Sequence, residues 1–330
     1  MRNVNTALVT GGAGFIGSHL VDELLRRGIE TYVIDNLSTG FLENLSSHKS
    51  NKNLHLLIGD ARNVQGLLGD SNIDIVFHEA AIASVPKSVS HPIMVHDVNV
   101  NMTLDLLNYC VKSGVKRLVF ASTAAVYGIV EGASASEKMI CKPNSPYGAS
   151  KLSVENYLNA YSMTYGLEVV ALRYFNVFGT RQRFSDYSGV ITTFINKLLK
   201  GERPLIYGDG TQVRDFVHVK DIVHANMLAM DTACAVRETF NVASGKATSI
   251  IDLAQIIGAL LGHEKTECLF TDPRPGDMKF GLASIDKIHN MLGYAPKFSM
   301  QAGLKEVIDS AARMISSLPL AQLSRTGEVV

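Results

Sequence analysis

The chain of 330 residues has no excess of either charge, and it has few cysteines and prolines. Lysine plus arginine total 31, and aspartate plus glutamate also total 31, so the formal net charge is zero. Because a nucleic-acid partner rewards a basic excess, this balance argues against one. Only 27 glycines and 9 prolines exclude the collagen-like and mucin-like classes, and 46 % hydrophobic residues exclude disorder over most of the chain.

Neither the cysteines nor the histidines show a metal-binding pattern. The four cysteines, Cys110, Cys141, Cys234 and Cys268, form no CxxC pair, and the ten histidines form no HExxH. This spacing opposes both a disulfide framework and a zinc site. We therefore expect reduced thiols, as in a cytoplasmic protein, and no metal.

The sequence also has no apolar run long enough to cross a bilayer. The most apolar stretch, residues 250–261, is short and contains Asp252 and Gln255. Residues 1–5 lead directly into an apolar strand and lack the pattern of a signal peptide. We expect a cytoplasmic chain with no membrane partner.

In the first half of the chain, short apolar strands alternate with helical segments. The predicted strands are 6–10, 31–34, 54–58, 73–77, 118–121 and 168–172, and the predicted helical segments are 15–27, 64–68, 93–112 and 147–165, with a polar loop over 41–53. Continuous apolar strands between helices predict a parallel sheet covered on both faces. The expected fold is α/β, a doubly wound parallel sheet of the Rossmann type.

After Arg173 the alternation gives way to loops rich in Gly, Asp and Arg. Since the length exceeds what one core usually holds, we predict a second, smaller α/β domain there, with helices at 190–200, 221–232, 251–261 and 300–316. The predicted division is a doubly wound domain over 1–173, to which about 215–235 return, a smaller substrate domain over 174–317, and a weakly patterned tail over 318–330.

A glycine-rich loop, Gly11 to Gly17, follows the first strand and opens the first helix. Its glycines permit a tight turn and let the backbone approach a pyrophosphate, which then lies at the positive end of the helix. Asp35 ends the second strand, where it can accept hydrogen bonds from ribose hydroxyls and would repel a 2′-phosphate. The pattern therefore favours NAD over NADP. Asp60, after the third strand, is either an adenine contact or the N-cap of the next turn.

Tyr147 and Lys151 are four residues apart, so both lie on one face of a helix. A nearby ammonium favours the phenolate and lowers a tyrosine pKa from its usual value of about 10. Tyr147 can thus act as a general base toward a sugar hydroxyl. Thr123 follows the fifth strand at the carboxyl edge of the sheet, where it can bond the same oxygen or simply cap a turn.

Together these motifs resemble the extended short-chain dehydrogenase/reductases, and within them the nucleotide-sugar C4 epimerases. The resemblance covers nearly the whole chain. It rests on Gly11–Gly17, Asp35, His78–Ala81, Asn99, Thr123, Tyr127–Gly128, Tyr147–Lys151, Arg173–Asn176, Arg214–Phe216, Arg274 and Asp277. It implies an isomerase with bound NAD that inverts C4 of a UDP-hexose by transient oxidation to a 4-keto sugar.

The resemblance also implies a role for each matching residue. Catalysis falls to Tyr147 as the base, Thr123 as its partner and Lys151 as the group that tunes Tyr147. The implied cofactor-binding residues are Gly11, Gly14, Phe15, Ile16, Gly17, Asp35, Asn36, Ser38, Gly40, Asp60, Ala61, Ala80, Ala81, Ala83, Asn99, Ser122, Tyr147, Lys151 and Tyr174. The implied substrate-binding residues are Ser84, Thr123, Tyr147, Asn176, Val190, Leu205, Tyr207, Arg214, Arg274, Asp277 and Gly281.

Several of these roles have plain alternatives. Arg214 and Arg274 resemble a diphosphate clamp, for which arginine forks are suited, but either one could form a surface salt bridge. Asn99 could instead have a buried structural role. Gly281 matches a position where a bulky tyrosine excludes N-acetyl groups, so the expected substrates are UDP-N-acetylglucosamine and UDP-N-acetylgalactosamine, and also UDP-glucose and UDP-galactose. Gly281 could equally be a loop glycine.

Related activities remain as alternatives. Dehydratases of this family carry Asp-Glu where this chain has Ala124 and Ala125, so dehydration is not expected. A UDP-glucuronate 4-epimerase or decarboxylase remains an alternative. An inactive NAD-binding sensor or scaffold is another, but the presence of both Tyr147 and Lys151 argues against it. Residues 93–112 and 150–165 resemble segments that pair two subunits, which predicts a homodimer; in a monomer the same apolar stripes would be core.

Overall fold

The computed structural model describes residues 4–130, 132, 134–183, 189–273 and 280–316. The predicted site residues Arg274 and Asp277 and the predicted tail 318–330 lie outside the described residues. The four cysteines are free. In the described part of the chain, no helix is long and apolar enough to cross a membrane.

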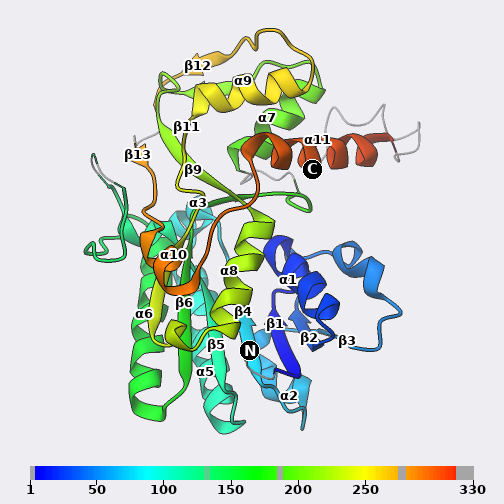
Figure 1. The fold of residues 1–330 in the computed structure, drawn as a ribbon, viewed down its shortest axis with the longest axis vertical. Coiled ribbons are helices and arrows are strands. Elements are labelled where there is room, and N and C mark those ends of the chain that lie inside the picture. Colours follow the sequence, from blue (N-terminus) through cyan, green and yellow to red (C-terminus); the bar gives the residue numbers. More distant parts are fainter. Residues whose placement is uncertain (1–3, 131, 133, 184–188, 274–279, 317–330) are drawn as a thin grey trace.

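A seven-stranded parallel sheet forms the larger part of the molecule (Figure 1). Its strand order is β10-β6-β5-β4-β1-β2-β3. The bounds are β1 (Thr6–Thr10), β2 (Glu30–Asp35), β3 (Leu54–Ile58), β4 (Ile75–His78), β5 (Arg117–Thr123), β6 (Glu168–Tyr174) and β10 (Glu238–Val242). All six pairings are parallel, which confirms the predicted doubly wound α/β fold.

Helices cover both faces of this sheet, so its strands are buried on both sides. On one face α1 (Phe15–Arg26) and α8 (Val219–Asp231) pack together over Val9 and Phe77. On the other face α2 (Val64–Leu68), α5 (Met102–Lys112) and α6 (Pro146–Tyr165) pack over Leu8 and Phe120. Neighbouring residues of β1 thus point into opposite cores, as the pleat of a strand requires.

Beyond β6 the chain builds a second, smaller group of strands and helices. The strand β9 (Val213–His218) pairs with β7 (Asn176–Phe178), β11 (Ala247–Ser249) and β13 (Phe280–Gly281), and β8 (Leu205–Tyr207) pairs with β12 (Leu269–Thr271). The helices α7 (Val190–Leu199), α9 (Ile250–Leu260) and α11 (Met300–Ser316) lie above the large sheet in Figure 1. Phe194, Ile257 and Leu304 share their core.

The remaining elements are short. They are the helices α3 (Val85–Ser90), α4 (Pro92–His96) and α10 (Asp286–Leu292), a π-helical turn (Asp97–Asn101), and the 3₁₀ turns Leu42–His48, Ala61–Asn63, Ala124–Tyr127 and Ala233–Ala235. The helical segment predicted over 93–112 is therefore continuous, but a π-helical turn joins its two α-helical parts.

The predicted strands differ from the observed ones both in their bounds and in their number. The fourth strand begins at Ile75, two residues later than predicted. Asp74 directly precedes it, and its carboxylate accepts hydrogen bonds from the backbone nitrogens of Asn5 and Thr6. The seventh strand, β10, was not predicted at all. It follows α8, after the chain has left the sheet and returned to pair with β6.

Candidate active site

The glycine loop forms the floor of a cleft at the carboxyl edge of the large sheet. Gly11 has φ +70°, and a Cβ atom there would lie 2.8 Å from the Ala80 nitrogen. A Cβ atom on Gly17 would collide with the Gly11 carbonyl oxygen. Gly14 caps α1 without a side-chain hydrogen bond, so N–H groups of the first turn remain available to an anion. The loop therefore fits the pyrophosphate of a dinucleotide.

Asp35 fixes this loop from the end of β2. One carboxylate oxygen accepts a hydrogen bond of 2.9 Å from the Ala13 nitrogen, and the other accepts one of 2.8 Å from the Leu37 nitrogen. Asp35 is only 7 % exposed, and a Cβ atom on Gly40 would lie 2.7 Å from its carboxylate. Since each oxygen has a second lone pair, Asp35 can still accept from a ribose hydroxyl in the cleft that it lines.

Asp60 caps the 3₁₀ turn Ala61–Asn63, which is the second of the two roles that the sequence left open for it. Its carboxylate accepts from the Arg62 nitrogen at 2.9 Å and also pairs with the Arg62 guanidinium. The paired guanidinium holds the pKa of Asp60 below its usual value. Asp60 nevertheless lines the cleft as well, so the two roles are compatible.

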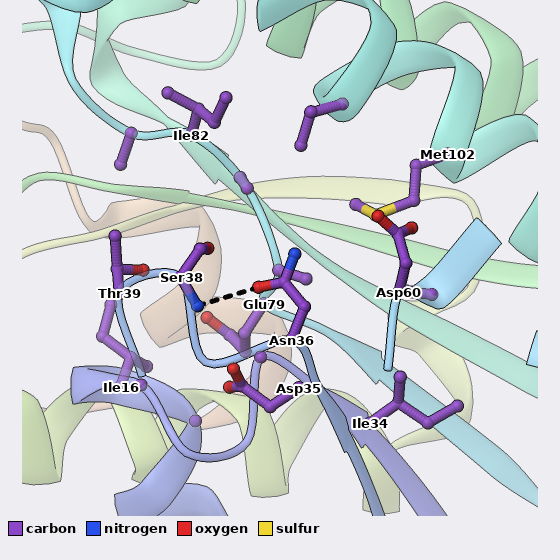
Figure 2. A pocket seen from close by; sticks show the side chains of 18 of the residues that line it. Ile16, Ile34, Asp35, Asn36, Ser38, Thr39, Asp60, Glu79, Ile82 and Met102 are labelled. Carbon is purple, nitrogen blue, oxygen red and sulfur yellow. Dashed lines mark hydrogen bonds between the residues drawn. The ribbon is translucent and has the colours of Figure 1, made fainter. Parts of the chain in front are cut away.

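We call this hollow the cofactor cleft; Figure 2 shows it closely. Thirteen of the predicted cofactor residues line it: Gly11, Gly14, Phe15, Ile16, Gly17, Asp35, Asn36, Ser38, Asp60, Ala61, Ala80, Ala81 and Ala83. Sequence reasoning missed seven further lining residues, Ile34, Thr39, Gly59, Glu79, Ile82, Val98 and Met102. Six predicted residues do not line it: Gly40, Asn99, Ser122, Tyr147, Lys151 and Tyr174.

Asn99 and Ser122, two of those six, form hydrogen bonds with other residues inside the protein. The Asn99 side chain, only 2 % exposed, bonds both backbone groups of Ile82 and the Ser150 hydroxyl. In this structure Asn99 therefore has the buried structural role that was the alternative to cofactor binding. The buried Ser122 hydroxyl donates to a Glu155 carboxylate at 2.5 Å.

Tyr147 reaches the site because α6 begins directly before it. Ser145 caps this helix by accepting from the Gly148 nitrogen. Gly148 packs so closely that a Cβ atom would lie 2.5 Å from the Ala125 carbonyl oxygen. Tyr147 and Thr123 line one pocket, and an interaction with the Thr123 side chain lowers the Tyr147 pKa. The Thr123 hydroxyl also accepts from the Ala125 nitrogen at 3.2 Å, so the capping alternative holds as well.

Lys151 lies one turn further along α6 and is only 3 % exposed. Its ammonium donates to the Ala121 carbonyl at 2.8 Å and lies 4.6 Å from the Phe120 ring centroid. Burial lowers the pKa of Lys151 to about 8, against the opposing charges of Glu79 and Glu155.

The expected lowering of the Tyr147 pKa is not what the structure shows. Burial raises the Tyr147 pKa, the hydrogen bond with Thr123 lowers it, and the Glu79 charge raises it further. The predicted lowering rested on nearby positive charge, whereas the removal of the phenol from water has the larger effect on the Tyr147 pKa here.

Two more pockets open beside the cofactor cleft. The inner pocket is lined by Val85, Thr123, Ala124, Ala125, Tyr127, Gly128, Val130, Tyr147, Tyr174, Phe175, Asn176, Arg214, Gly281 and Leu282. The outer pocket is lined by Asn176, Val190, Thr193, Phe194, Lys197, Leu205, Ile206, Tyr207, Gln212, Arg214 and Ile250. Asn176 and Arg214 line both, so the two pockets adjoin.

Every described residue predicted for the substrate except Ser84 lines one of these pockets. Ser84 caps α3 by accepting from the Lys87 nitrogen, next to the pocket residue Val85. Among residues that sequence reasoning missed, Thr193, Phe194 and Lys197 lie three, four and seven positions after the predicted Val190. Helical periodicity along α7 places them on the same face and could have identified them.

Comparison with known proteins gives the family. The model of the NAD dependent epimerase/dehydratase family matches residues 7–243. A putative UDP-glucose 4-epimerase of Methanocaldococcus jannaschii is 37 % identical over 92 % of this chain and 97 % of its own. The chain belongs to the NAD-dependent epimerase/dehydratase family.

Solved structures agree. A UDP-N-acetylglucosamine 4-epimerase from Methanobrevibacter ruminantium, in complex with UDP-N-acetylmuramic acid, has a TM-score of 0.89 and 39 % identity over 95 % of this chain and 100 % of its own. A UDP-glucuronic acid 4-epimerase from Bacillus cereus, in complex with UDP-glucuronic acid and NAD, has a TM-score of 0.86 and 32 % identity over 94 % and 99 %.

Membership of this epimerase/dehydratase family confirms the resemblance drawn from the sequence. It also confirms NAD as the cofactor and the prediction that the chain is an enzyme. In the described part of this family member, no cluster of three or more potential metal ligands occurs.

Proposed function

We propose that this chain is a UDP-sugar 4-epimerase in which Tyr147, Thr123 and Lys151 carry the chemistry. One observation carries the proposal: Tyr147 and Thr123 line the inner pocket, and Tyr174, which lines the same pocket, is hydrogen-bonded to Glu79 in the cofactor cleft. The proton-handling residues thus lie where a sugar and a dinucleotide would meet.

Tyr147 takes the proton from the C4 hydroxyl, and Thr123 orients that oxygen through its own hydroxyl. NAD, when bound, accepts the C4 hydride and returns it. Lys151 lies one turn after Tyr147 on α6, and a positive charge near a tyrosine favours the phenolate over the phenol. The keto sugar turns within the inner pocket so that the opposite face of C4 would receive the returning hydride, and Tyr147 returns the proton to the C4 oxygen.

The residues beside Thr123 favour epimerisation over dehydration. Ala124 and Ala125 both line the inner pocket, and neither side chain can move a proton. Removal of water from a sugar needs an acid and a base near its ring carbons, whereas inversion at C4 needs only the base at the hydroxyl. The small side chains also leave room for the sugar to turn.

The division of labour between the two groups of elements follows from these pockets. We propose that residues 1–173, together with the returning segment near 215–235, hold the cofactor, and that the smaller domain holds the UDP group in the outer pocket. Arg214 lies where both pockets adjoin, so its guanidinium is suited to the diphosphate. Asn176 is fixed there by a hydrogen bond to the Asp215 carbonyl.

The direct test uses the purified protein with UDP-N-acetylglucosamine, UDP-glucose and UDP-glucuronate in separate reactions, followed by separation of the products. We expect the two neutral sugars to be converted to their galacto epimers. Turnover of UDP-glucuronate alone would favour the uronate alternative. If no sugar reacts even with NAD supplied, the chain is not a UDP-sugar epimerase.

Gly281 bears on the choice of sugar, and we predict that Gly281→Tyr impairs the N-acetylated substrate selectively. A phenol at this position would fill the inner pocket where the chain now has a hydrogen atom. We expect about a 100-fold loss of kcat/KM with UDP-N-acetylglucosamine and a much smaller loss with UDP-glucose.

The matched control is Gly281→Ala. Its Cβ atom would lie 3.3 Å from the Val213 oxygen and 3.4 Å from Cδ of Arg214, so it tests the close packing alone. The difference between the two variants then reports the size of the side chain. Equal losses on both sugars in the tyrosine variant would show that Gly281 does not select the substrate.

We further propose a homodimer formed through α4 and α6. These helices expose large apolar side chains, including Ile93 at 84 % and Met163 at 66 %. Light scattering after size exclusion should give twice the mass of the 35.8 kDa chain, and Ile93→Arg should give monomers by burying a charge in the interface. A monomer mass for the unmodified protein at micromolar concentration would rule out this dimer.

A further inference from the structure

Glu79 lies within the His78–Ala81 motif, but neither the residue roles implied by the sequence nor the proposed chemistry use it. It follows directly after β4 and lines the cofactor cleft, where Figure 2 labels it beside Asp35 and Ser38. One of its carboxyl oxygens accepts a hydrogen bond of 2.8 Å from the hydroxyl of Tyr174. Because Tyr174 lines the inner pocket, this bond links the two sites.

A third residue, Asn226, determines which group donates in the bond between Tyr174 and Glu79. The side-chain amide of Asn226, which is fully buried on α8, donates to the Tyr174 hydroxyl at 2.7 Å and to the Ile222 carbonyl at 2.9 Å. A tyrosine hydroxyl has a single hydrogen, so Tyr174 must donate it to Glu79. A chain of three side chains thus runs from α8 through β6 to the cofactor cleft.

Glu79 also acts on the reactive pair through its charge. Its carboxylate raises the pKa of Tyr147 and opposes the loss of the Lys151 proton. Burial in turn raises the pKa of Glu79 itself to about 7, while the bond from Tyr174 and the Lys151 charge favour its ionised form. Glu79 is therefore poised to change charge near neutral pH.

Other ionisable groups near Glu79 already have hydrogen-bond or ion-pair partners of their own. His78 bonds Thr10 and Thr103 through its two ring nitrogens, and burial lowers its pKa to about 3, so it stays neutral. Glu155 also acts on Lys151, but its carboxylate is paired with Arg173 at 2.6 Å. On the cleft side, Asp35 and Asp60 line the same hollow as Glu79; both already accept the hydrogen bonds described above.

We propose that Glu79 is a positioning residue: its carboxyl group holds Tyr174 between the two sites, and its charge sets the proton affinity of the Tyr147–Lys151 pair. The second part rests on the proposed role of Tyr147 as the base. A negative Glu79 disfavours the phenolate, so a neutral amide at this position makes the phenolate easier to form.

The charge of Glu79 therefore determines the direction in which the Tyr147 pKa should change. Above about pH 7 Glu79 is ionised and keeps the Tyr147 pKa high. In Glu79→Gln the negative charge is absent at every pH, while the amide oxygen can still accept from Tyr174. We expect the Tyr147 pKa to fall by about one pH unit. The epimerisation rate rises with pH as Tyr147 loses its proton, and we expect this rise to move by the same amount toward lower pH.

The experiment is an ultraviolet titration of the holoenzyme, in which phenolate absorbance is followed from pH 5 to 11. The signal of Tyr147 is the difference between each protein and the same protein carrying Tyr147→Phe. Glu267→Gln makes the same chemical change at an exposed position in the smaller domain and should leave the titration unchanged. Coincident Tyr147 titrations for Glu79→Gln and the unmodified protein would overturn the proposal.

Glu79→Ala provides a second variant should Glu79→Gln not fold. It also removes the negative charge at every pH, so the Tyr147 titration should move in the same direction as in Glu79→Gln. An unmoved titration in this variant counts against the proposal. Because the titration needs no sugar, it judges the role of Glu79 even if no UDP-sugar is turned over.

Discussion

Replacement of Tyr147 by phenylalanine should lower kcat of epimerisation by about 10³-fold, while KM for the UDP-sugar changes little. The ring of Tyr147 packs where α6 meets the Ala124–Tyr127 turn, and phenylalanine retains that packing. What is lost is the hydroxyl, which shares the inner pocket with Thr123. General acid–base catalysis is typically worth about 10²–10⁴-fold, and Lys151 cannot replace the base because its ammonium is held by Ala121.

Steady-state rates with the preferred UDP-sugar and a parallel binding isotherm test this prediction. Tyr161→Phe is the matched control, since it removes a hydroxyl from the same helix, where it bonds Asn108 away from both pockets. Its activity should stay close to that of the unmodified protein. Nearly full activity in Tyr147→Phe would remove Tyr147 from its assigned role, and a loss confined to KM would make it a binding residue.

The parts of the site that sequence predicts well are those formed by consecutive residues. The glycine loop, Asp35 and the pair Tyr147 and Lys151 each depend on one strand–turn–helix unit or on one helical turn, so local spacing determines which face they share. The first six strands were identified for a similar reason, because each is a short apolar run beside a helix.

The parts that sequence does not predict depend on partners far along the chain. The strand β10 contains Asn241 and Glu238, which make it look polar, and only its pairing with β6 reveals it. The hydrogen bond between Glu79 and Tyr174 joins residues 95 positions apart. Likewise, the direction of the Tyr147 pKa shift follows from burial, which no motif expresses.

Gly17→Ala should abolish tight binding of NAD, weakening it by more than about 100-fold. The added Cβ atom would collide with the Gly11 carbonyl and lie 2.9 Å from Cα of Gly12, so the loop must move. Those contacts are backbone atoms, which cannot turn aside as a flexible side chain would. Displacement of the loop would reorient the backbone N–H groups of the first turn of α1. Binding of the cofactor pyrophosphate depends on the orientation of these groups.

The measurement is the amount of NAD retained after purification, together with titration of NAD into the stripped protein. Gly28→Ala separates this effect from ordinary destabilisation. Gly28 has φ +75°, so alanine costs about 1 kcal/mol in backbone strain, but a Cβ atom there meets nothing within 4 Å and the residue does not line the cofactor cleft. Gly28→Ala should therefore lower the unfolding temperature and keep its NAD. If Gly17→Ala retains NAD as well as Gly28→Ala does, the close approach of helix and loop is not what holds the cofactor.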